Sequence, residues 1–110
     1  MAGTSGSGQA SERIRHVVLF QWKPGTTQAK IDEAYRELAG LLGKIPGLLQ
    51  FEGGPYSSPE GLNKQWSHGF IMTFDSAASR DAYLPHPEHE RVKAIIVPHL
   101  ADVVAFDFEV

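Results

Sequence analysis

Apolar and polar residues alternate along several segments of the chain, and this period of two predicts β-strands. The most regular segment is 14–22, where one face carries Ile14, His16, Val18, Phe20 and Trp22. The opposite face of this segment is also fairly apolar. We therefore expect a central strand that is covered on both sides.

Three further segments show the same alternation and predict the remaining strands. Segment 48–53 has Leu49 and Phe51 on one face, and segment 102–110 places apolar side chains at alternate positions from Val104 to Val110. Between them, segment 66–74 carries on one face Trp66, His68, Phe70, Met72 and Phe74.

Helical spacing appears in two other parts of the chain. Apolar residues recur three and four apart over nearly five turns between Ile31 and Ile45, which predicts a long amphipathic helix. Either Thr26 or Thr27 can cap its start, and Pro46-Gly47 is expected to end it. Later in the chain, Ser76 is a suitable cap for a short helix that reaches Tyr83, and a second helical piece is expected from Pro87.

The order of these elements is β-α-β-β-α-β, which is typical of the ferredoxin-like α+β fold with an antiparallel four-stranded sheet. In this topology the first and third strands are adjacent and central. The helices can cover only one face of the sheet, yet the strands are apolar on both faces. We therefore predict a homodimer in which two sheets pack face to face.

Composition narrows the class of protein. The chain has 110 residues, 42% of them hydrophobic, a formal net charge of −3 and no cysteine. Residues 1–12 are polar and rich in Gly and Ser, so we expect a flexible tail followed by one domain at 13–110. The charge gives no reason to expect a nucleic-acid partner, and no apolar run is long enough to cross a membrane. With no signal peptide at its start, a cytoplasmic protein is expected.

The segment 83–89, which reads Tyr-Leu-Pro-His-Pro-Glu-His, is the strongest candidate for chemistry. A phenol at Tyr83 and an imidazole at His89 can exchange protons with a carbonyl or enol substrate when they are held together. The alternative is structural: His86 caps the helix, and Tyr83 and His89 pack against a strand.

Two more histidines, His16 and His68, fall on the aromatic face of the central strands, with Phe20, Trp66 and Phe70 nearby. They are either core residues satisfied by hydrogen bonds or a polar cluster in an apolar cavity, and strand register decides between the two. His86 and His89 have a spacing compatible with two metal ligands, but no third ligand is obvious. A third ligand could come only from His16, His68 or Glu88, so we expect no metal site. We also expect no cofactor.

Several of these segments together resemble the stress-responsive A/B barrel domain family. They are 14–20 (Ile-Arg-His-Val-Val-Leu-Phe), 66–74 (Trp-Ser-His-Gly-Phe-Ile-Met-Thr-Phe), 83–89, and the closing 104–108 (Val-Ala-Phe-Asp-Phe). The resemblance spans essentially the whole folded chain. It implies a dimeric α+β barrel made of two ferredoxin-like subunits.

The resemblance also implies a range of functions. Some plant members are small stress-induced proteins without known catalysis, whereas one plant member is a polyketide cyclase that performs an aldol condensation without a metal or organic cofactor. In that enzyme the residues matching Tyr83 and His89 form the acid–base pair, and those matching His16 and His68 line the cavity.

Our functional prediction is a homodimeric barrel that binds a small apolar carbonyl or phenolic ligand and acts as a cofactor-free acid–base enzyme of the polyketide-cyclase or aldol type. Tyr83 and His89 are the expected catalytic residues. The expected substrate-binding residues are His16, His68, His86, Phe20, Trp66 and Phe70. Two alternatives remain: a noncatalytic stress-related structural or ligand-binding homodimer, and a barrel similar to cofactor-free monooxygenases.

Overall fold

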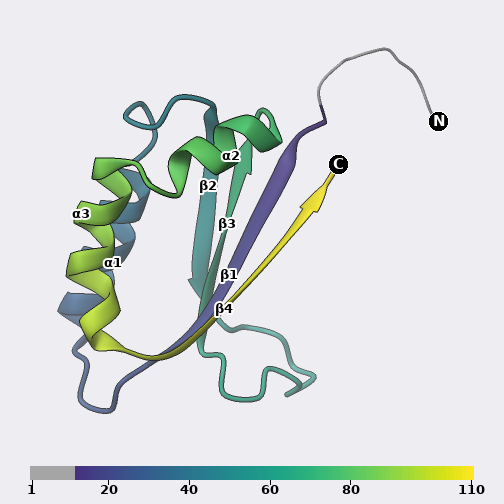
Figure 1. Ribbon diagram of the computed structural model, residues 1–110. Helices are drawn as coiled ribbons and strands as arrows, with labels where there is room; N and C mark the ends of the chain where they lie inside the picture. Colours follow the sequence, from purple (N-terminus) through teal and green to yellow (C-terminus); the bar gives the residue numbers. More distant parts are fainter. Residues whose placement is uncertain (1–11) are drawn as a thin grey trace.

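The computed structural model describes residues 12–110, so nearly all of the predicted tail lies outside the described residues. The elements follow the predicted β-α-β-β-α-β order (Figure 1). Along the chain they are β1 (Ile14–Trp22), α1 (Gln28–Ala39), β2 (Leu48–Pro55), β3 (His68–Phe74), α2 (Ala77–Tyr83), α3 (Pro87–Ile96), the 3₁₀ turn η2 (Val97–His99) and β4 (Leu100–Glu109).

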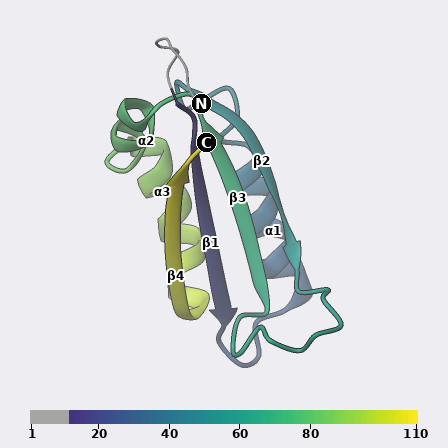
Figure 2. The same cartoon turned by 90° about the vertical axis from the view of Figure 1, so that its right-hand side faces the viewer.

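The four strands form one antiparallel sheet in the order β2-β3-β1-β4, which places β1 and β3 in the centre as predicted. The ferredoxin-like α+β fold is therefore confirmed. Both long helices lie on the same face of the sheet: α1 runs behind β2 and β3, and α3 runs behind β1 and β4 (Figures 1 and 2). None of the helices in residues 12–110 is long and apolar enough to cross a membrane.

The core lies between the sheet and these helices. Alternate residues of β1, from Ile14 to Trp22, are buried there, which confirms the face predicted from the sequence. Met72 and Phe74 on the neighbouring strand β3 are fully buried on the same side. His16 is the polar member of the β1 series, and it lies opposite Met72.

Helix α1 is shorter than predicted. It begins after the N-cap Thr27 and ends at Ala39, because the backbone turns at Gly40 and again at Gly43, whose φ is +85°. Leu41 and Ile45 are nevertheless buried, since turns held by local hydrogen bonds keep them against the core. The helical spacing in the sequence therefore predicted the buried residues correctly. The predicted helix, however, was about six residues too long at its C-terminal end.

Two strand predictions were also wrong in detail. A bulge between Leu48 and Gln50 shifts β2, so Leu48 and not Leu49 shares the helix-facing side with Phe51. Strand β3 begins at His68, because Trp66 belongs to the preceding loop, where its backbone N–H donates to the Asn63 carbonyl. Alternation alone does not reveal where a bulge or loop interrupts the sheet.

The second face of the sheet is apolar and has no helix over it within residues 12–110. Val104, Phe106 and Phe108 of β4 lie on this face beside Leu19 of β1, in agreement with the predicted alternation. The most exposed of them is Phe106, whose side chain is 68% accessible. An apolar surface of this kind is uncommon on a single-chain protein and typically marks an interface.

The buried turn after α1 leads to a stability prediction. Leu41→Ala should lower the free energy of unfolding by about 2–5 kcal/mol, because Leu41 is fully buried and its removal leaves a cavity. Urea unfolding followed by tryptophan fluorescence measures this change. As a control, Leu62→Ala removes the same atoms from a loop side chain that is 73% exposed, so a shift within about 0.5 kcal/mol is expected. Equal shifts for the two variants would contradict the assigned core.

Candidate functional site

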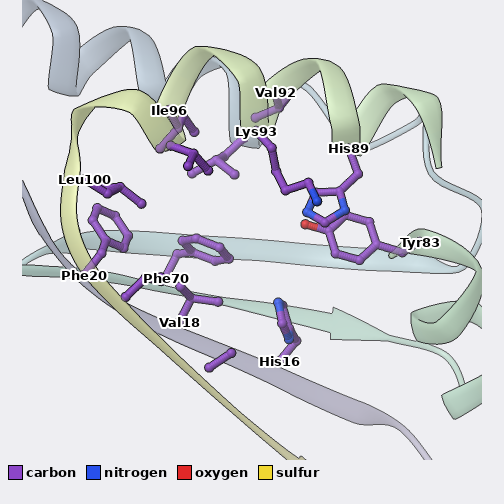
Figure 3. A pocket seen from close by; sticks show the side chains of 14 residues that line it. His16, Val18, Phe20, Phe70, Tyr83, His89, Val92, Lys93, Ile96 and Leu100 are labelled. Carbon is purple, nitrogen blue, oxygen red and sulfur yellow. The ribbon is translucent and has the colours of Figure 1, made fainter. Parts of the chain in front are cut away.

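A cavity of about 210 Å³ lies between helix α3 and the helix-facing side of the sheet (Figure 3). Its walls are mostly apolar and include Val18, Phe20, Phe70, Val92, Ile96 and Leu100. The polar side chains of the lining are His16, Tyr83, His89 and Lys93. Val97 and Val103 also line the cavity and are about half exposed, which indicates an opening between α3 and β4.

Tyr83 and His89 meet because of the way α2 is joined to α3. Tyr83 is the last residue of α2, and His89 lies in the first turn of α3. The short link between them is held by His86, whose Nδ1 accepts a hydrogen bond of 3.0 Å from the backbone N–H of Glu88. In this arrangement the rings of Tyr83 and His89 stack, with centroids 4.0 Å apart and planes 25° from parallel.

The hydrogen bond of His89 determines which of its nitrogens can act as a base. Nδ1 lies 3.0 Å from the carbonyl oxygen of Leu84, and because a carbonyl only accepts, Nδ1 carries the proton. In the neutral ring, Nε2 is then unprotonated. Burial lowers the pKa of His89 below its usual 6.5, while the Leu84 hydrogen bond acts in the opposite direction. His89 is therefore mostly neutral near pH 7 and can accept a proton at Nε2.

Tyr83 has the complementary property of a proton donor. Burial raises the pKa of its phenol well above the usual 10, so the hydroxyl stays protonated. Within residues 12–110 no group forms a hydrogen bond with this hydroxyl. Figure 3 shows it directed into the cavity, beside the ring of His89. The cavity therefore holds an unengaged O–H donor next to an unprotonated nitrogen.

His16 approaches the pair from β1 and is held from behind by two charged residues. Its Nδ1 lies 2.7 Å from Oδ1 of Asp107, and Nη1 of Arg80 donates to Oδ2 of the same carboxylate at 2.7 Å. The His16 and Tyr83 rings are 6.0 Å apart in an edge-to-face arrangement. Because Nδ1 faces the carboxylate, Nε2 of His16 remains for the cavity side.

The structure brings together only some of the predicted site residues. Tyr83, His89 and His16 meet in the cavity, and Phe20 and Phe70 line its wall. The remaining three predicted residues, His68, His86 and Trp66, do not line it.

Each of these three has another place in the fold. His68 stacks on Phe20 near the far end of the sheet, and its Nδ1 pairs with Oγ of Ser67 at 2.9 Å. Burial lowers the pKa of His68, which favours its neutral form. His86 caps α3, as the structural alternative predicted. Trp66 lies in the loop before β3 and lines a separate groove that includes Leu19 on the open face.

Sequence reasoning missed three residues around the cavity: Lys93, Asp107 and Arg80. Lys93 follows His89 by four positions, so helical spacing could have placed it on the same face. Asp107 interrupts an apolar strand, which is a weak signal. Arg80 had no signal in the sequence, because its pairing with Asp107 joins residues of α2 and β4. Among residues 12–110 there is no cluster of three or more His, Asp or Glu side chains arranged to hold a metal ion.

Two comparisons with known proteins, one with a family profile and one with single sequences, lead to the same family. The profile of the stress-responsive A/B barrel domain matches residues 14–110. HS1, a stress-response A/B barrel domain-containing protein of Arabidopsis thaliana, is 30% identical over 101 residues, which cover 92% of this chain and 93% of HS1. Olivetolic acid cyclase of Cannabis sativa is 22% identical over 76 residues, covering 69% of this chain and 75% of the cyclase.

Solved structures share the fold. A dimeric ferredoxin-like protein of unknown function from Jannaschia sp. CCS1 superposes with a TM-score of 0.80 at 30% identity, covering 89% of this chain and 99% of that protein. The hydroxynitrile lyase of Passiflora edulis superposes with a TM-score of 0.83 at 21% identity, covering 90% and 94% of the two chains. At that identity, the likeness to the lyase shows the fold alone.

The hydrogen bonds of two histidines predict opposite tautomers. His89 should carry its proton on Nδ1 and titrate with a pKa below 6.5, whereas His86, whose Nδ1 accepts from Glu88, should carry its proton on Nε2 when neutral. Long-range ¹H–¹⁵N NMR spectra recorded across the pH range distinguish the ring nitrogens. A His89 with its proton on Nε2, or a pKa of 6.5 or above, would contradict the geometry of the candidate base.

Proposed function

This chain belongs to the stress-responsive A/B barrel domain family, as its sequence segments predicted, and on that basis we propose that its cavity binds a small apolar carbonyl or phenolic compound. We further propose that Tyr83 and His89 catalyse a cofactor-free acid–base reaction on it. The observation that carries the proposal is the stacked pair itself, which offers a phenol donor and an imidazole acceptor to the same apolar cavity.

The proposed reaction begins with removal of a proton from the carbon beside a carbonyl. Nε2 of His89 takes the proton, and the electron pair of the C–H bond moves to the carbonyl oxygen to give an enolate. The Tyr83 hydroxyl donates a hydrogen bond to that oxygen and stabilises its charge. In an aldol-type closure, the enolate carbon then bonds to a second carbonyl carbon of the substrate. The protonated His89 returns its proton to the resulting alkoxide, which restores the neutral base.

His16 has a supporting role in this proposal. It faces Tyr83 from the opposite side of the cavity, and Asp107 and Arg80 fix its ring. A hydrogen bond from or to its Nε2 would orient the substrate between the strand and the helix. His68, which the sequence suggested for the same task, is separated from the cavity by Phe20 and takes no part in the proposal.

Cavity size restricts the substrate. An engineered apolar cavity of about 150 Å³ is large enough to bind benzene. The present cavity of about 210 Å³ therefore suits one substituted ring or a short chain. Ring closure is also the kind of activity named for the relative olivetolic acid cyclase, although that relative matches only part of the chain.

One observation favours a second candidate, a noncatalytic ligand-binding or structural protein. Each of the four histidines discussed above has a partner within the protein: Asp107 for His16, Ser67 for His68, Glu88 for His86 and Leu84 for His89. Such partners satisfy buried imidazoles whether or not a reaction takes place. Kinetic tests separate the two candidates.

We also propose that the chain forms a homodimer through the open face of its sheet. Leu19, Val104, Phe106 and Phe108 present an apolar surface there, and burying it against a second copy would remove it from water. The similar protein from Jannaschia sp. CCS1 is described as dimeric, which supports this assembly.

The acid–base proposal predicts a measurable exchange reaction. The protein should accelerate deuterium exchange at the α-carbon of phenylacetone in D₂O, because His89 removes that proton and Tyr83 stabilises the enolate. His89→Gln and Tyr83→Phe should each reduce the exchange rate by about 10²-fold or more. ¹H NMR measures this rate from the loss of the α-proton signal. His99→Gln is the matched control, since His99 lies outside the cavity and should leave the rate unchanged. Exchange no faster than buffer, or full rates in both cavity variants, would favour the noncatalytic candidate.

The same exchange reaction should depend on pH through His89. Only the neutral imidazole accepts a proton, and burial lowers its pKa below 6.5. The rate should therefore change little between pH 8 and pH 7, where the imidazole is mostly neutral, and fall tenfold per pH unit at pH values well below the His89 pKa. An activity that declines already between pH 8 and pH 7 would show that another group is the base.

The dimer proposal predicts that Phe106→Glu separates the subunits, because a buried carboxylate without a partner is strongly unfavourable at an interface. Light scattering after size-exclusion chromatography should give about twice the chain mass of 12.1 kDa for the unchanged protein and a single-chain mass for the variant. Leu42→Glu is the control, since Leu42 is exposed after α1 on the helix side. A dimer that survives Phe106→Glu would exclude this face.

A further inference from the structure

Lys93 is the one cavity-lining residue of the described chain that carries a permanent charge. It lies on α3 four positions after His89, so the two side chains project from the same face of the helix, with Cβ atoms about 5–6 Å apart. Figure 3 shows its side chain extending along the cavity toward the ring of His89. The cavity therefore has a cation about one helical turn from its candidate base.

The charge of Lys93 acts on the site already. Burial is the main cause that lowers the pKa of His89; the Lys93 ammonium also lowers it, whereas the Leu84 hydrogen bond and the Glu90 carboxylate act in the opposite direction, so both members of the Lys93–Glu90 pair lie near His89. The next residue of the same face, Val97, is about half exposed, so Lys93 lies between His89 and the opening of the cavity beside Val97. A ligand that enters beside Val97 would pass this ammonium group on its way to His89.

The present partner of Lys93 is weakly held. Nζ pairs with Oε1 of Glu90 at 3.1 Å, and the two side chains are 44% and 55% exposed. An exposed pair three residues apart on a helix contributes little to stability, so a ligand can replace it readily. The other carboxylate near the site, that of Asp107, is already bound by Arg80 and His16. The cavity lining therefore offers an entering anion one cation, Lys93, and no carboxylate, because Glu90 lies outside the lining.

From this geometry we infer that Lys93 is a specificity residue for a carboxylate, so that the site takes a small apolar carboxylic acid that also bears a ketone or phenol group. The inference rests on the proposed function and specifies its substrate class. A carboxylate bound to Nζ at the opening directs the apolar part of the ligand between Phe70 and Val92. The ketone or phenol oxygen of the ligand then points toward Tyr83. A charge-assisted hydrogen bond in such a partly buried place is stronger than one in water.

The structural alternative is that Lys93 only covers apolar surface with its four-carbon stem while its charge stays in water. Lys93→Met separates the two, because methionine keeps an unbranched apolar side chain and removes the charge. The probes are phenylacetate and phenylacetamide, which have the same shape and differ in charge. Titration calorimetry or NMR titration gives the dissociation constants of the full-length protein for both.

We expect the unchanged protein to bind phenylacetate at least about tenfold more tightly than phenylacetamide. Lys93→Met should weaken phenylacetate binding about tenfold and leave phenylacetamide binding unchanged. Glu90→Gln, which frees Nζ from its present partner, should strengthen phenylacetate binding. Lys44→Met is the matched control: Lys44 also pairs with a glutamate, at 3.6 Å, but does not line the cavity, so neither affinity should change.

Equal loss of both probes in Lys93→Met, or unchanged affinity for phenylacetate, would overturn the inference. Failure of the proposed catalysis would give a different result from failure of the Lys93 inference. In that case deuterium exchange is absent, while the preference for phenylacetate and its dependence on Lys93 persist. If neither probe binds the unchanged protein, both the ligand-binding role of the cavity and this inference are overturned.

Discussion

Strand β1 pairs with β3 on one side and with β4 on the other, so its alternation decides which side chains of three strands face the helices. Because β1 turns the series from Ile14 to Trp22 toward α1 and α3, it carries His16 into the core together with Phe20. The same register turns Phe106 and Leu19 to the open face. A shift of one residue would exchange the two faces and remove both the cavity and the apolar surface.

The candidate site depends on the register of β1 and on one connection, the junction of α2 and α3. The sheet supplies an apolar floor with a single imidazole, and the junction supplies a phenol and a second imidazole above it. Both imidazoles are fixed from outside the cavity: His89 by the Leu84 carbonyl and His16 by Asp107. Fixing one nitrogen of each ring leaves the other for a ligand, which is how a small number of polar groups can give a mostly apolar cavity its chemistry.

The cavity and the open face of the sheet are separate surfaces of the same subunit. The cavity lies under α3 and opens between that helix and β4, whereas Phe106 and Phe108 point away from the helices. Strand β4 therefore contributes to both, with Val103 and Ala105 on the cavity side and the phenylalanines on the other. Covering the open face would enclose β4 on both of its faces and would hold one wall of the cavity in place.

The sequence by itself determined the element order, the faces of β1, β3 and β4, the cap of α2, the start of α3 at Pro87, and the candidate pair Tyr83 and His89, because strand alternation, helix starts and a contiguous motif are local. Only the tertiary structure decided the bulge at Leu48, the end of α1 at Ala39 and the position of Trp66 outside the sheet. It also separated His16, which joins the pair, from His68, which shares its face but lies behind Phe20. These outcomes depend on hydrogen bonds and packing between residues far apart in the chain, such as Arg80 with Asp107, and no local pattern records such contacts.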